Sequence, residues 1–228
     1  MKPVYGRHNR NDPSETPLKL APLFLIPAMV AGCGPKAIDL PADPVGRAAT
    51  CGVVAAAAAR TAVTDPKAPL PLAAQGKIFH YALLAASDGG EFKAETANLV
   101  NKRMRELEAG ITGGKWRDLV PACAAAFPVA EKSDVRLPPV RLQAQLACEE
   151  LADFTGIALE GAESHYGNEL AAYRRMRTDL NDALAPGLRA KAGPGIEAQT
   201  RERDRALAAA AQLGSPIPVL DKCRERFK

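Results

Sequence analysis

The stretch RMRELEAGITGGKWRDLVPACAAAF at residues 103–127 has a counterpart at residues 203–227, RDRALAAAAQLGSPIPVLDKCRERF. Seven identical residues lie 100 positions apart. In the first block they are Arg103, Arg105, Leu107, Ala109, Gly114, Cys123 and Phe127, and in the second Arg203, Arg205, Leu207, Ala209, Gly214, Cys223 and Phe227. Self-similarity at a fixed distance is the signature of a repeated structural unit. The alternative interpretation is that helices rich in Ala, Arg and Leu resemble one another by composition alone.

A second pair of similar blocks lies upstream, 97 positions apart. Leu40, Pro41, Cys51, Val54 and Ala55 align with Leu137, Pro138, Cys148, Leu151 and Ala152. A three-residue insertion between the blocks accounts for the change of distance. All four cysteines after Cys33 obey one of the two distances. We therefore predict two helical repeats, over residues 40–131 and 132–228.

The residues after 40 are typical of helices throughout. Apolar residues recur at helical spacing, most clearly at Phe92, Leu99, Val100, Met104, Leu107 and Ile111. Clusters of Gly and Pro separate the segments, at 88–90, 113–114, 138–139, 186–187, 193–195 and 214–216. The pattern predicts an all-α fold, a duplicated four-helix unit. The expected helices lie near 44–63, 71–87, 91–110, 116–127, 138–161, 166–185, 195–213 and 217–227.

The N-terminal residues are organised as an export signal. A positive region with Lys2, Arg7, Arg10 and Lys19 precedes an apolar run over residues 20–31. That run is too short to span a bilayer as a helix, and it contains two prolines. It ends in Val30-Ala31-Gly32-Cys33, which resembles the lipobox of bacterial lipoprotein precursors.

The lipobox resemblance implies a lipid anchor. Residues 1–32 would be a signal peptide, Cys33 the acylated first residue of the mature chain (diacylglyceryl, with a further acyl group such as palmitate), and residues 33–46 a tether. Because Gly34 follows in place of Asp, the resemblance favours the periplasmic face of the outer membrane. The alternatives are a plain secretory signal and a buried N-terminal helix whose cysteine is there by chance.

The cysteine count indicates the same compartment. The chain has five cysteines, and lipid on Cys33 leaves four that can pair in an oxidising periplasm. Cys51, Cys123, Cys148 and Cys223 fall on apolar helical faces and are expected to point inward. The duplication favours Cys51–Cys123 and Cys148–Cys223. A swapped pairing, Cys51 with Cys223 and Cys123 with Cys148, stays open.

Few residues indicate catalysis. Glu163-Ser164-His165-Tyr166 resembles the segment around the catalytic acid of soluble lytic transglycosylases, which implies Glu163 as the acid. The family's downstream Gly-Leu-Met-Gln segment is absent, and the alternative is an ordinary helix start. His80 and His165 lack carboxylates at ligand spacing, so we interpret both as ordinary helix residues and predict no metal site. No nucleotide or cofactor motif is present, and no cofactor is expected.

The charged residues are expected to be exposed. Arg174-Arg175-x-Arg177 and Arg201-Glu-Arg-Asp-Arg205 interleave with acids at helical spacing, which is typical of solvated faces with i,i+4 pairs. The alternative is an anionic contact with lipid head groups or wall polymer. A net charge of +4 is too small for a nucleic-acid partner.

These observations together favour a non-catalytic envelope lipoprotein. It would bind or scaffold a partner in the periplasm, an envelope protein or the cell wall, while its lipid holds it to the membrane. The alternatives are a peptidoglycan-acting enzyme with Glu163 as its acid, and an enzyme inhibitor of the immunity type.

Overall fold

The computed structural model describes residues 39–65 and 67–227, and these form helices joined by turns and by longer non-helical segments. Cys33 and the signal and lipobox residues lie outside these ranges. Within them the chain has eight α-helices, one 3-10 helix and no strand, which confirms the all-α prediction. The helices are α1 (Pro44–Thr61), α2 (Leu72–Ala86), α3 (Ala94–Thr112), α4 (Trp116–Ala126), η1 (Pro128–Glu131), α5 (Arg141–Ala158), α6 (Glu163–Ala192), α7 (Ile196–Ala211) and α8 (Pro216–Arg226).

The start of α1 shows how local sequence sets a helix boundary. Asp43 is the N-cap, and its side chain accepts a hydrogen bond from the Gly46 amide at 2.6 Å. Pro44 follows at the first helical position, where its missing N–H costs nothing. Residues 44–46, where the expected tether and the expected helix overlap, are therefore helical.

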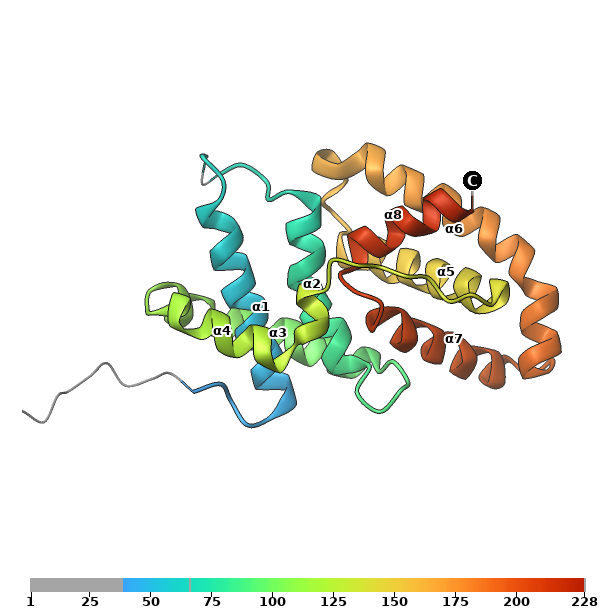
Figure 1. Ribbon diagram of the computed structural model, residues 1–228, viewed down its shortest axis with the longest axis horizontal. Coiled ribbons are helices and arrows are strands. Elements are labelled where there is room, and N and C mark those ends of the chain that lie inside the picture. Colours follow the sequence, from blue (N-terminus) through green and yellow to red (C-terminus); the bar gives the residue numbers. More distant parts are fainter. Residues whose placement is uncertain (1–38, 66, 228) are drawn as a thin grey trace, which may run out of the picture. The chain divides into compact units, whose positions relative to one another are not determined.

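The helices fall into two halves with the same contact pattern (Figure 1). In the first half α1 contacts α2, α3 and α4, and in the second α5 contacts α6, α7 and α8. The first helix of each half is thus its centre. This is the arrangement expected of a duplicated unit.

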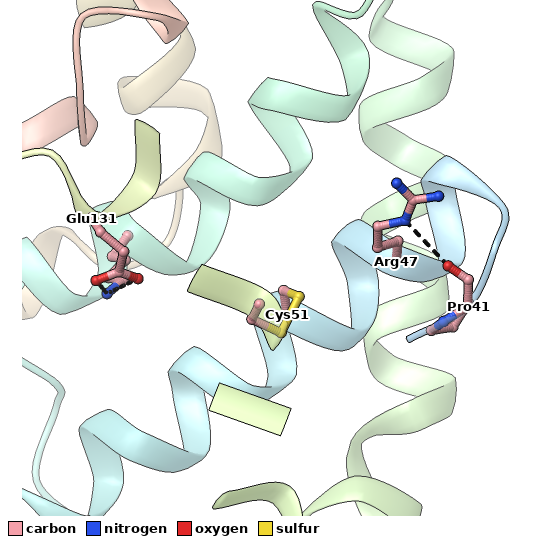
Figure 2. Close-up of a disulfide and its surroundings, with 6 residues drawn as sticks. Pro41, Arg47, Cys51 and Glu131 are labelled. Atoms are coloured by element: carbon pink, nitrogen blue, oxygen red, sulfur yellow. Dashed lines mark hydrogen bonds and ion pairs between the residues drawn. A yellow bond between two sulfur atoms is a disulfide. The ribbon is translucent and has the colours of Figure 1, made fainter. Parts of the chain in front are cut away.

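Each half has one disulfide between its first and last helix. Cys51 bonds to Cys123, with Cα atoms 5.4 Å apart, and Cys148 bonds to Cys223, with Cα atoms 5.7 Å apart. Figure 2 shows the first of these beside Arg47, whose Nε donates to the Pro41 carbonyl at 3.2 Å. All four cysteines are buried. The structure thus has the pairing that the duplication favours, and the swapped pairing is wrong.

Helix α2 joins the two halves, since it contacts α7 and α8 as well as α1 (Figure 1). Gly76 permits the close approach: a Cβ there would lie 2.5 Å from Cγ1 of Ile217 on α8. Phe79 packs edge-on against Phe154 of α5, with ring centroids 5.8 Å apart. The core is therefore continuous from one half to the other.

Two sequence predictions about the helices are wrong. A break was expected at Pro186-Gly187, but α6 continues through it to Ala192. Gly187 instead permits close packing, because a Cβ there would lie 2.8 Å from Cδ1 of Leu142 on α5. Leu99 was assigned to the apolar face of its helix, yet its side chain is 55% exposed, and Val100 is the buried neighbour.

Candidate binding groove

An open groove of roughly 720 Å³ lies mainly on the first half of the protein, and Ala158 and Leu159 at the end of α5 complete its lining. We call it the α1/α3 groove, because Ala56 and Ala57 on α1 and Met104 on α3 line it, together with Phe79 on α2. The two alanines leave the space that larger side chains would fill. A cavity of this size with an apolar lining is in the usual range for a binding site.

The polar groups of the α1/α3 groove come mainly from α3. Asn101, Arg105 and Glu108 lie on the same face of that helix, because they are three or four residues apart. Trp116, the one tryptophan in the sequence, lies at the start of α4 and also lines the groove. The groove thus combines an apolar lining with charges of both signs.

A second cleft, of roughly 670 Å³, lies beside the turn formed by Gly89 and Gly90. Two arginines line it, but both bind protein groups. Arg47 donates to the Pro41 carbonyl, and Arg205 forms an ion pair with Glu91 at 2.6 Å. These contacts compete with any anionic ligand, so we consider the cleft a weaker candidate.

Few features of the sequence indicate the α1/α3 groove. The apolar positions of α3 were recognised, but Met104 and Trp116 could equally have been core residues. The run of alanines from Ala55 to Ala59 is the feature that could have indicated it, since small side chains on a core helix leave room for something else.

The predicted catalytic acid, Glu163, is the first residue of α6. Its side chain is not among those that the structure describes, so its role stays a prediction. His165 is exposed at the start of the same helix. The next residue, Tyr166, is buried, and its hydroxyl donates to the carbonyl oxygen of Leu70. Tyr166 thereby holds the start of α6 against the segment that leads into α2.

His80 is a fully buried residue of α2. Its Nε2 lies 2.8 Å from the carbonyl oxygen of Ala211, which can only accept, so Nε2 carries the proton. Burial lowers the pKa of His80 to about 4, although the carbonyl favours the charged ring. His80 is therefore a neutral structural residue, and His165, on another helix, is exposed. Among the residues described, no cluster of three or more His, Cys, Asp or Glu side chains could hold a metal ion.

The predicted i,i+4 pairing of the charged residues is correct for Arg201, which lies 3.9 Å from Glu197. It is wrong for three other arginines, which pair with residues of other segments. Arg203 contacts Glu149 and Glu150 of α5, Arg177 lies 3.0 Å from Asp153, and Arg205 contacts Glu91. The positive charges of α6 and α7 therefore help to fix the helices to one another.

The contacts of Arg203 form the most buried charged cluster described. Burial, together with the adjacent Glu149, raises the pKa of Glu150 to about 8, even though Arg203 acts in the opposite direction. Asn181 of α6 accepts a hydrogen bond from Arg203 at 3.2 Å. None of these residues lines the α1/α3 groove, so the cluster joins α5, α6 and α7 and has no evident part in binding.

Comparisons with known proteins found no match, whether to a family model, a curated protein or a solved structure. No helix in the described ranges is long and apolar enough to cross a membrane.

Proposed function

We propose that this protein is a lipid-anchored protein of the bacterial envelope that binds or scaffolds a partner without catalysing a reaction. The α1/α3 groove carries the binding part of the proposal. It is open, apolar in its lining and bordered by charged residues, and a body tied by disulfides holds its walls. Such a site binds through its shape and apolar surface.

The cysteines support the location. The two disulfides use Cys51, Cys123, Cys148 and Cys223, which leaves Cys33 as the odd cysteine of five. Structural disulfides are typical of exported proteins, and acylation of Cys33 would account for the fifth cysteine. The lipobox resemblance points to the same residue, so two separate features of the sequence support one anchor.

Duplication of a four-helix unit is part of the proposal. The disulfides close segments of similar length, with sequence separations of 72 and 75. Each connects the first and last helix of its half, and the first helix contacts the other three in both halves. These agreements concern contacts between helices, so a similar composition of the helices does not explain them.

The anchor can be tested in a bacterial host fed an alkyne-tagged fatty acid. The wild-type protein is expected to take up the tag, to fractionate with the outer membrane and to lose residues 1–32. The variant C33S should lose both the tag and the membrane association, whereas the control A42S should retain them. An untagged wild-type protein in the soluble periplasmic fraction would contradict the anchor.

A further inference from the structure

The second half of the protein has a face that corresponds to the α1/α3 groove, and repeat 1 covers it. Phe154 of α5 packs on Phe79 of α2, and the Asp204 carbonyl on α7 accepts a hydrogen bond from the Phe92 amide at 3.2 Å. The carbonyl of Ala211 on α7 accepts from His80 of α2. The occupant of this face is thus helix α2, with the turn that follows it (Figure 1).

The corresponding positions of the first half lie in or beside the open groove. At the distance of 97 residues Phe154 aligns with Ala57, and at the distance of 100 Asp204 aligns with Met104. Ala57 and Met104 both line the α1/α3 groove. Ala211 aligns with Ile111, whose neighbour Thr112 lines it as well. The face of the second half is thus covered by helix α2, whereas no described helix covers the corresponding α1/α3 groove.

The charges point to the same kind of occupant. On the covered face Arg205 of α7 pairs with Glu91, which follows α2, at 2.6 Å. The counterpart of Arg205 is Arg105, which lines the open groove. Within residues 39–65 and 67–227 no carboxylate lies within ion-pair distance of Arg105. An occupant with a carboxylate near this position would complete the pair.

The dimensions also suit a helix. The wall that α3 contributes runs from Asn101 to Thr112, about 16 Å along the axis, which is about three helical turns. Helix-in-groove recognition places apolar side chains at spacings of three and four residues into such a site.

We propose that the α1/α3 groove binds one amphipathic helix of a partner protein, in the way that α2 lies on the second half. The helix presents an aromatic side chain to Ala57 and Met104 and a carboxylate to Arg105. A second copy of this chain is a poor occupant: its α2 is already buried, and α6, the counterpart of α2, has mostly charged and polar residues on its outer face. The inference rests on the binding function proposed above.

The test uses a synthetic peptide of residues 72–92, which contains α2, Glu91 and Phe92, added to the intact purified protein. Trp116 is the fluorescent probe, since it lines the groove and the peptide contains no tryptophan. As the peptide is added, the Trp116 emission is expected to change until it saturates. The helical signal in circular dichroism should increase when peptide and protein are mixed. The variant A56F, which fills the groove at a half-buried site, should weaken binding at least tenfold. The matched control A190F, on an exposed position of α6, should leave it unchanged.

A charge exchange tests the predicted pair. The variant R105E should weaken binding of the unchanged peptide several-fold. A peptide with E91K should bind R105E about as tightly as the unchanged peptide binds the wild-type protein, and should bind the wild-type protein weakly. Circular dichroism and thermal melting of each variant identify any that fails to fold. If A56F fails to fold, N101F replaces it, because Asn101 is an exposed residue of α3 that lines the groove.

The inference would be overturned by no saturable binding of the peptide, or by binding that A56F and N101F both leave unchanged. Displacement of the peptide by dodecyl maltoside below its critical micelle concentration would also overturn it, because that result would indicate an acyl-chain site. Dimerisation in light scattering that A56F abolishes would assign the groove to a second copy instead. Fatty-acid labelling of Cys33 is measured separately, so failure of the peptide leaves the membrane anchor intact.

Discussion

The side chain of His80 on α2 donates from Nε2 to the carbonyl oxygen of Ala211 at the end of α7, at 2.8 Å, and this bond crosses between the two halves of the protein. The ring is fully buried, and its Nδ1 has no partner among the described atoms. Protonation of Nδ1 would place a charge in the core. Burial of the ring therefore links protein stability to pH.

We expect the free energy of unfolding to fall as pH falls from about 6.5 to 4. The folded pKa of His80 is about 4 and the ordinary value is 6.5, so the unfolded chain binds more protons in this window. The loss from His80 alone is on the order of 3 kcal/mol. Urea unfolding at several pH values measures it, and H80Q should remove this component. An equal decline in H80Q and wild type would contradict the assignment.

Glu150 is expected to act in the opposite direction. Burial holds its folded pKa at about 8, above the ordinary 4.5, so the folded protein keeps a proton that the unfolded chain releases. The stability that this provides is complete below about pH 4.5 and is lost as pH rises towards 8. The variant E150Q should therefore match wild type at pH 4 and become the more stable protein by pH 8. Greater stability of wild type at pH 8 would show that the carboxylate is ionised and well paired.

Much of the fold could be predicted from the sequence because its signals are local. Helix boundaries depend on nearby Gly, Pro and capping residues, and the predicted start of α1 near residue 44 agrees with the Asp43 cap. The cysteine pairing followed from two constant distances. The break expected at Pro186 failed because tertiary packing against Leu142 outweighs the lost hydrogen bond of one proline.

The groove and the charge pairs could not be predicted, since both depend on which helices meet. Arg203 and Arg201 look alike in the sequence, yet Arg203 contacts α5 and Arg201 pairs along its own helix. Likewise Ala57 lines an open groove and Phe154, at the corresponding position, is covered by α2. Sequence spacing describes one helix at a time and does not say which face another helix will occupy.

Two glycines in helices should respond oppositely to the same substitution. In G76A the new Cβ would lie 2.5 Å from Ile217, so α2 and α8 must move apart, at a cost of about 1–3 kcal/mol. In G110A on α3 nothing lies within 4 Å of the new Cβ, and the gain in helix propensity should stabilise the protein by about 0.5–1 kcal/mol. Chemical denaturation of both variants checks this. If G76A were as stable as G110A, the close contact between the halves would be wrong.

The two disulfides should contribute nearly equal stability. Their sequence separations, 72 and 75, differ so little that chain entropy predicts the same effect for both, about 4 kcal/mol. We expect C51A/C123A and C148A/C223A each to lower the free energy of unfolding by about 2–5 kcal/mol. Cys33 is replaced in both variants and in the reference protein, so that it cannot form new bonds. Paired alanine variants are needed because a single substitution leaves a reactive thiol that can form new bonds.

Since α2 connects the halves, each variant should still unfold in one transition. Two separate transitions would mean that the halves are independently stable. Peptide mapping without reductant gives the connectivity directly, and a Cys51–Cys223 peptide would contradict it.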